Sequence, residues 1–226
     1  MNGETRPAFY ALTAGGWRDY VTLLHAPYTV WHLSYVAIGA ALAPQMRWGL
    51  LGWTVLAFLL AMGVGAHALD ELNGRPLRTR IPSPVLAGLA AVSIAGACAI
   101  GVAVAAGSTW WLLLFVAFGA FAAVAYNLEL FGGAFHSDLW FGAAWGAFPV
   151  LTAYFASAER VRLAALAAAA AALLVSLAQR TLSTEVRFAR RNAGDPGSAR
   201  PAELALQLLA AALPALAGAL LLSRTG

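Results

Sequence analysis

One polar stretch, residues 67–82, interrupts a chain that is otherwise mostly apolar. It begins with His67, Asp70 and Glu71, whose spacing of three and four residues would place them on one face of a helix. Ionised carboxylates at membrane depth are costly, so they usually pair with a base or bind a ligand. Mg²⁺ prefers oxygen ligands and often links one or two carboxylates to phosphate groups. The spacing therefore predicts a site for Mg²⁺ or for a polar head group, with Asp70 and Glu71 as the metal ligands.

Arginines follow the two acids in the same stretch, at Arg75, Arg78 and Arg80. A guanidinium group matches phosphate oxygens through two parallel hydrogen bonds, so Arg75 and Arg78 are candidates to hold a phosphate. Asn73 and His67 are candidates for further contacts to the same ligand. Two other interpretations stay open. The acids can pair with Arg75 and Arg78 in an interfacial salt-bridge network, or the arginines can serve topology and lipid contact.

Two further polar clusters lie after later hydrophobic runs. The first contains Tyr126 and Asp138; we expect Tyr126 to donate a hydrogen bond to a leaving oxygen and Asp138 to orient an arginine. Tyrosine is also common at membrane interfaces, and Asp138 is equally suited to cap the next helix. The second, residues 180–187, holds one acid, Glu185, and two arginines, Arg180 and Arg187, which a helix would place near each other. It is compatible with a phosphate site or with an ordinary basic loop.

Long hydrophobic runs must position these clusters. Of the 226 residues, 61% are hydrophobic and 11% are charged, and the mean hydropathy is +0.73. A soluble domain usually carries about 25% charged residues, so this composition excludes that class. Runs of about 20 apolar residues match the hydrocarbon core of a bilayer. The sequence predicts an all-α, polytopic membrane helix bundle of about seven transmembrane helices, at residues 28–46, 48–69, 84–106, 109–128, 138–156, 162–179 and 202–223.

The chain divides into two parts on this interpretation. Residues 1–27 form an N-terminal interfacial segment, in which a short helix turns Asp19 outward and has an apolar side made of Trp17, Tyr20, Leu23 and Leu24. Residues 28–226 form the transmembrane bundle. Within the bundle, residues 180–201 are expected to be a polar loop broken at Gly194-Asp195-Pro196-Gly197.

Arginine counts predict the orientation. With seven spans, ten of the fourteen arginines fall on the side of the N-terminus and four on the other side. The positive-inside rule then places the N-terminus and the polar clusters in the cytoplasm, as expected for an integral protein of the cell inner or plasma membrane. The net charge of +4 comes from arginines beside the membrane. Lipid head groups, and not nucleic acid, are therefore the expected partners.

With these motifs in place, the chain resembles the UbiA superfamily of intramembrane prenyltransferases over roughly residues 20–190. One motif similar to the family's Arg-Pro-Leu/Ile is Gly74-Arg75-Pro76-Leu77. One similar to its Tyr-Ser motif is Ala125-Tyr126-Asn127-Leu128. A third similar segment is Ser137-Asp138-Leu139, which leads into Gly146-Ala147-Phe148-Pro149-Val150-Leu151.

The resemblance implies an isoprenyl diphosphate substrate, held through Mg²⁺ by two Asp-rich motifs, with the prenyl chain in an apolar tunnel between helices. It implies transfer of the prenyl group to an acceptor, or its cyclisation. Carried onto this chain, the first Asp-rich motif keeps only Asp70, and the second falls near residues 181–185, where Glu185 is the acid. Tyr126 matches the motif tyrosine.

These departures leave three functions open. The first is a prenyltransferase-like enzyme that binds Mg²⁺ through Asp70, Glu71 and Glu185 and holds the phosphates with Arg75, Arg78 and Arg187. The second is a diverged relative with other lipid chemistry. The third is a non-catalytic membrane protein of the same fold that binds a lipid or serves as an assembly partner. The family usually has nine spans, so a chain of seven leaves one flank of the bundle open, which a homo-oligomer would cover.

Overall fold

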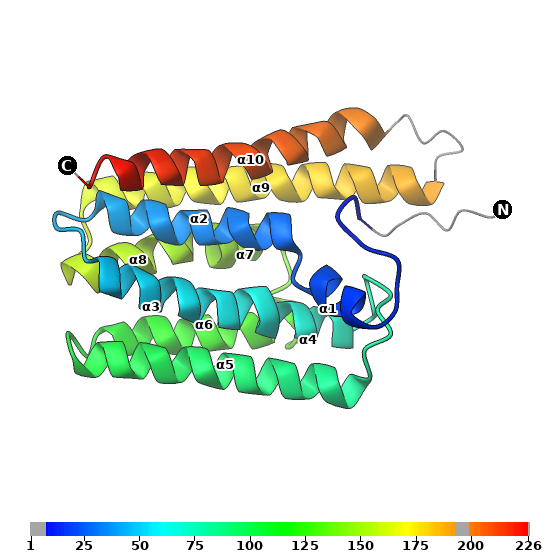
Figure 1. The fold of residues 1–226 in the computed structure, drawn as a ribbon, viewed down its shortest axis with the longest axis horizontal. Helices are drawn as coiled ribbons and strands as arrows, with labels where there is room; N and C mark the ends of the chain where they lie inside the picture. The colour runs from blue at the N-terminus through cyan, green and yellow to red at the C-terminus, as the bar shows by residue number, and fades with distance from the viewer. Residues whose placement is uncertain (1–7, 193–198, 226) are drawn as a thin grey trace.

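The computed structural model describes residues 8–192 and 199–225, and all regular structure within them is helical (Figure 1). In chain order the elements are α1 (Trp17–Leu23), α2 (Ala26–Leu42), α3 (Trp48–Phe58), η1 (Leu59–Ala66), α4 (His67–Leu72), α5 (Ser83–Ala106), α6 (Leu112–Asn127), α7 (Asp138–Phe141), η2 (Gly142–Ala147), α8 (Phe148–Ala158), α9 (Leu163–Asn192) and α10 (Arg200–Leu222). The prediction of an all-α protein is confirmed.

Five stretches of the described chain are long and apolar enough to cross a membrane: Trp48–Leu72, Ser83–Ala106, Asp138–Ala158, Leu163–Arg190 and Arg200–Leu222. The helix α6 is apolar but shorter, with 16 residues, and α2 has 17. These lengths fit an integral membrane protein. The count of seven spans and a UbiA-like arrangement stay predictions.

The helix α9 continues through Asn192, so the prediction of a polar loop from residue 180 is wrong. The fall in hydropathy marks the end of the apolar stretch and not the end of the helix, because Arg, Leu and Glu all favour helical backbone. Arg180 and Arg187 are seven residues apart and therefore project from one face of α9. The break predicted at residues 194–197 lies outside the described residues.

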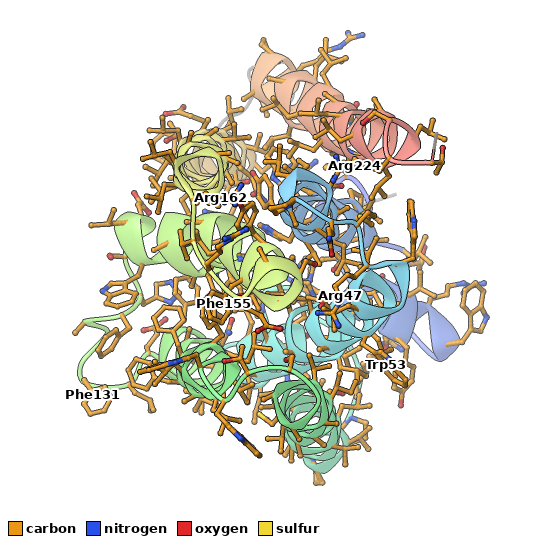
Figure 2. All side chains as sticks on the ribbon, turned by 90° about the vertical axis from the view of Figure 1, so that its left-hand side faces the viewer. Arg47, Trp53, Phe131, Phe155, Arg162 and Arg224 are labelled. Atoms are coloured by element: carbon orange, nitrogen blue, oxygen red, sulfur yellow. The ribbon has the colours of Figure 1, made fainter. Side chains whose placement is uncertain are left out.

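The long helices lie side by side along one direction, with the loops gathered at two ends (Figure 1). The helix α2 packs between α10 and α8, α9 packs against η2, and α5 packs against η1 and α6. Figure 2 looks onto the end where Arg47, Arg162 and Arg224 lie. We call it the Arg47 end. The opposite end, with α1 and α4, is called the Asp70 end.

Two π-helical segments interrupt the long helices α3–α4 and α7–α8. Pro149 affects the second segment, because proline has no N–H. The carbonyl oxygen of Trp145, four residues earlier, therefore has no helical hydrogen-bond donor. His32 Nδ1 lies 2.9 Å from that carbonyl oxygen and donates to it. In the first π segment, His67 Nδ1 lies 3.1 Å from the carbonyl oxygen of Gly63. Histidine side chains therefore supply main-chain hydrogen bonds at both interruptions.

Residues 8–27, the described part of the N-terminal segment, lie against the Asp70 end of the bundle (Figure 1). Leu23 is buried, as predicted for the apolar side of α1. The prediction that Asp19 faces outward is wrong, since this residue is only 3% exposed. Its carboxylate accepts hydrogen bonds from the main-chain N–H groups of Gly15 and Arg80, both at 2.9 Å. Asp19 thus ties the N-terminal segment to the loop that follows α4.

The close approach of α2 to α8 gives a first prediction. A Cβ on Gly39 would collide with the carbonyl oxygen of Val150. We expect Gly39→Ala to lower the free energy of unfolding by about 1–3 kcal/mol, the usual range for overpacked positions. Gly52→Ala in α3 is the control, because nothing lies within 4 Å of its Cβ position. Thermal unfolding in detergent measures both variants, and equal midpoints would contradict the close approach.

Candidate functional site

Arg180 of α9 gathers polar groups from three other parts of the chain at the Asp70 end. Its Nε lies 2.9 Å from Asp138 Oδ1, at the start of α7. Its Nη1 donates to the hydroxyl of Tyr126, near the end of α6, at 2.7 Å. Its Nη2 lies 3.5 Å from Nε2 of His136, in the loop between those helices. The predicted role of Asp138, to orient an arginine, matches this geometry.

Asp70 faces this cluster from α4 and is half-buried. Its carboxylate interacts electrostatically with His136, Arg180 and Arg187. Within the described part of the chain, it accepts no hydrogen bond and forms no ion pair. Its oxygens are therefore available to a ligand. We call Asp70, Tyr126, His136, Arg180 and Arg187 the polar centre.

Glu71, the neighbour of Asp70, faces a different environment. It is fully buried, and both carboxylate oxygens are used by the loop after α4. The main-chain N–H groups of Leu77 and Thr79 donate to it at 2.9 and 2.8 Å, and the Thr79 hydroxyl donates at 2.8 Å. Consecutive helical residues point about 100° apart, which explains how adjacent acids separate. This geometry favours a structural role for Glu71 over the predicted metal role.

Arg75 and Asn73, two predicted phosphate ligands of this loop, make structural hydrogen bonds within the protein. Arg75 donates to the carbonyl oxygen of Ile81 at 2.6 Å and to Ser83 Oγ at 2.7 Å, which fastens the loop to the start of α5. Asn73 Nδ2 donates to the carbonyl oxygen of Asn127 at 3.1 Å. The Arg78 side chain is exposed, on a left-handed backbone with φ 56°. None of these three contacts reaches the polar centre.

Arg187 and Glu185, two members of the predicted cluster at residues 180–187, lie on different faces of α9. Arg187 shares the face of Arg180 and interacts electrostatically with Asp70 and Tyr126. Glu185, five residues after Arg180, is rotated from that face by about 140° and is exposed. The structure therefore brings Arg187, but not Glu185, to the polar centre.

The four histidines share one hydrogen-bonding pattern, in which Nδ1 lies 2.9–3.1 Å from a main-chain carbonyl oxygen. In a neutral ring this assigns the proton to Nδ1 and leaves Nε2 as an acceptor. The rings of His25 and His67 lie 4.0 Å apart. Burial, and then the neighbouring His67, lowers the pKa of His25, so this ring is neutral near pH 7. His67 is held in this pair beside the polar centre.

An apolar cavity lies between α3 and η1 on one side and α5, α6 and α8 on the others. Its volume is about 100 Å³, below the usual range of ligand pockets of about 300–1,000 Å³, so its walls would have to move apart to admit a long hydrocarbon chain. At its end nearest the polar centre are Met62, Ala123 and Trp145, which pack in one cluster with Tyr126. The rings of Tyr126 and Trp145 meet edge to face, with centroids 5.7 Å apart. An aromatic boundary thus divides the cavity from the polar centre.

The acids do not form a magnesium site by themselves. Mg²⁺ requires near-octahedral oxygen coordination. Among residues 8–192 and 199–225, no group of three or more His, Cys, Asp or Glu side chains is placed to hold a metal ion. Asp70 has Glu71 beside it in sequence, but Glu71 is committed to the loop and Glu185 is turned away. These residues do not fit the Asp-rich arrangement that the resemblance implies.

Two members of the polar centre, Arg180 and His136, were not among the predicted site residues. The spacing of seven between Arg180 and Arg187 is a signal for one helical face. Both arginines fall in the predicted cluster at residues 180–187, for which a phosphate site and an ordinary basic loop were both open. His136 belongs to the predicted cluster that contains Tyr126 and Asp138. Its contact with Arg180 could not be predicted, because it depends on the path of the loop between α6 and α7.

Comparisons with protein-family models, curated proteins and solved structures give no match to this chain. The resemblance to the UbiA superfamily therefore stays a prediction from its motifs. Function has to be argued from the geometry of the polar centre and the cavity.

The separate roles of the acids give a second prediction. Glu71→Gln places an amide against N–H donors and removes hydrogen bonds to a charged group, so we expect it to cost about 1.5–3 kcal/mol of folding stability. Glu185→Gln is the matched control, because Glu185 is exposed, and such changes stay within about 0.5 kcal/mol. Thermal unfolding of the two variants makes the comparison. A larger loss for Glu185→Gln would refute the assignment of Glu71 to the loop.

Proposed function

We propose that this membrane protein binds a long-chain lipid with a phosphorylated head group, an isoprenyl diphosphate, at the Asp70 end of the bundle. The observation that carries the proposal is the placement of two arginines next to one end of an apolar cavity, with only an aromatic boundary between them. An isoprenyl diphosphate has the same two parts, a charged head and a hydrocarbon chain. The motif resemblance implies the same ligand.

Arg180 and Arg187 supply the positive charge for the head group. Guanidinium groups bind phosphate oxygens in pairs, and they do so best when their orientation is already fixed. Arg180 is fixed by its bonds to Tyr126, His136 and Asp138. Asp70 faces the two arginines from α4. Its carboxylate would interact favourably with a head group that carries a proton or a bound cation.

Transfer or cyclisation of the prenyl chain is the reaction this arrangement serves. The bond between the first chain carbon and the diphosphate oxygen breaks, and its electron pair leaves on the diphosphate, whose charge the arginines stabilise. The Tyr126 hydroxyl accepts a hydrogen bond from Arg180 and can donate its own hydrogen to the leaving oxygen. The aromatic face of Trp145 stabilises the allylic cation. An acceptor captures the cation and then loses a proton. Alternatively, a double bond of the chain closes onto the cation, and the ring cation so formed loses a proton to give a neutral product.

A non-catalytic lipid-binding or assembly protein is the second candidate function. It is favoured by the acids, which do not fit the magnesium arrangement of the resemblance. The two candidates differ in one readout, the release of inorganic diphosphate from bound geranylgeranyl diphosphate. Binding without release, with and without added Mg²⁺ and acceptor, would select the non-catalytic function.

The proposed orientation places the Asp70 end in the cytoplasm together with the N-terminus. Arg75, Arg78 and Arg180 lie at this end, whereas Arg47 and Arg224 lie at the other. The positive-inside rule supports this orientation for the chain as a whole. The head group would then enter from the cytoplasmic side.

Arg180 tests the proposed binding. Arg180→Ala removes charge-assisted hydrogen bonds worth about 1.5–3 kcal/mol, so we expect at least about 10-fold weaker binding of geranylgeranyl diphosphate. Arg180→Lys should fall in between, because it keeps the charge and loses the planar fork. Arg47→Ala is the control, since Arg47 lies at the opposite end, 3.9 Å from Glu159. Calorimetric titration of the purified protein in detergent measures all three, and an unchanged affinity for Arg180→Ala would rule out this site.

The length of the cavity limits the length of the chain. Along α6 the cavity runs from Leu112 to Ala123, which corresponds to about 16 Å of helix. An extended chain advances about 1.2 Å per bond, so an isoprene unit with four main-chain atoms takes about 5 Å. The length of this path matches about three to four isoprene units. Because the cavity volume is about 100 Å³, the lining side chains must move apart to admit them.

Thr152 lines the part of the cavity toward the Arg47 end. We expect the larger side chain of Thr152→Phe to fill this end of the cavity and so shorten it. The preferred ligand should then be a chain one isoprene unit shorter. Affinities for geranyl, farnesyl and geranylgeranyl diphosphate measure the shift. The same order of affinities in the variant and the wild type would show that the chain does not occupy this cavity.

A further inference from the structure

Residues 8–14 form a strap that precedes α1 and lies at the Asp70 end of the bundle (Figure 1). We propose that the strap is a gate over the polar centre and that the ring of Tyr10 is its plug. The gate controls access to Asp70 from the aqueous side. It does not depend on the identity of the ligand.

Tyr10 holds the strap onto the bundle through its ring. Its centroid lies 5.4 Å from that of His25 and 5.6 Å from that of Tyr28, the latter edge to face. The Tyr10 side chain also interacts electrostatically with Asp70 and Arg187 of the polar centre. Burial, and then the nearby Tyr28 and Asp70, raises the pKa of Tyr10, so its hydroxyl stays protonated. A neutral aromatic side chain thus stands beside the charged groups that a head group would contact.

The strap is hinged, whereas α1 behind it is anchored. Gly15 and Gly16 join the two, with φ of 126° and 61°, and nothing lies within 4 Å of either Cβ position. Such backbone angles favour glycine. The Gly15 N–H donates to Asp19 Oδ1 at 2.9 Å, so the strap turns about the residues before this bond. The helix α1 is held by the bond from Arg80 N–H to Asp19 and by the burial of Leu23.

One main-chain hydrogen bond fastens the described strap to α1. The N–H of Leu12 donates to Thr22 Oγ1 at 3.0 Å. Its net contribution is about that of a single intramolecular hydrogen bond, and each aromatic ring pair adds a comparable amount. Ala11, which is 1% exposed, and the edge-to-face contact of Phe9 with Tyr28 also hold the strap. The contacts of Tyr10 and the bond to Thr22 can be removed separately from these.

Thiol reactivity tests the gate without any lipid. Asp70→Cys is made in a Cys98→Ser background, because Cys98 is the native cysteine of the chain. The rate of modification by a small charged methanethiosulfonate reagent then reports access to position 70. Tyr10→Ala should raise this rate at least about 10-fold, because two ring contacts are lost. Tyr10→Phe keeps the ring and should stay within about twofold of the parent.

A second variant removes the fastening bond without touching the plug. Thr22→Val is nearly isosteric, abolishes the acceptor of the Leu12 N–H, and should raise the rate about fivefold. Tyr20→Ala is the control, because Tyr20 is an exposed tyrosine of α1. Gate function is overturned if Tyr10→Ala reacts no faster than Tyr20→Ala, or if Tyr10→Phe reacts as fast as Tyr10→Ala. Failure of diphosphate binding would remove the proposed ligand and leave this result unaffected.

Discussion

The guanidinium of Arg180 is the interaction on which the Asp70 end of the bundle depends. A charged group at the edge of an apolar bundle is costly unless it finds partners. Its partners Tyr126, His136 and Asp138 belong to three different segments, so one side chain fixes their mutual positions. The Asp138 side chain is 72% exposed, against 22% for Arg180. Because solvent weakens exposed ion pairs, the bonds to Tyr126 and His136 contribute more to this arrangement.

Close packing of small residues sets the register that puts Arg180 there. A Cβ on Gly146 of η2 would lie 2.6 Å from both the carbonyl oxygen of Ala172 and Ser176 Oγ, so glycine is needed for η2 to touch α9. Ser176 is fully buried and donates to the hydroxyl of Tyr35 at 3.3 Å. Ser176 lies one helical turn before Arg180. The contact that fixes the position of Ser176 along the axis of α9 therefore also fixes the position of Arg180. The polar centre is thus a consequence of glycine packing deeper in the bundle.

Composition predicts the helical membrane class. In lipid there is no water to bond the main-chain N–H and C=O groups, and a long apolar run pairs them within itself by forming a helix. The same reasoning does not predict the roles of particular residues in the site. Glu71 and Asp70 look equivalent in sequence, yet the role of Glu71 is set by main-chain N–H groups at residues 77 and 79, which no side-chain pattern reveals. The role of Arg75 is set in the same way, because its guanidinium donates to the main-chain carbonyl oxygen of Ile81. Hydropathy ends a helix where apolar residues end, whereas α9 continues through Asn192, so the predicted loop at residues 180–201 hides the face that Arg180 and Arg187 share.

The boundary between the polar centre and the cavity has fixed and adaptable members. Tyr126 is held at its hydroxyl by Arg180 and at its carbonyl by His136. Trp145 is held at its carbonyl by His32, since Pro149 has released that oxygen from the helix. Met62 completes the boundary with an unbranched side chain, which rearranges easily compared with the aromatic rings. Passage of a hydrocarbon chain from the polar centre into the cavity therefore requires movement of Met62, while the two rings keep the positions at which they would face a head group and a chain.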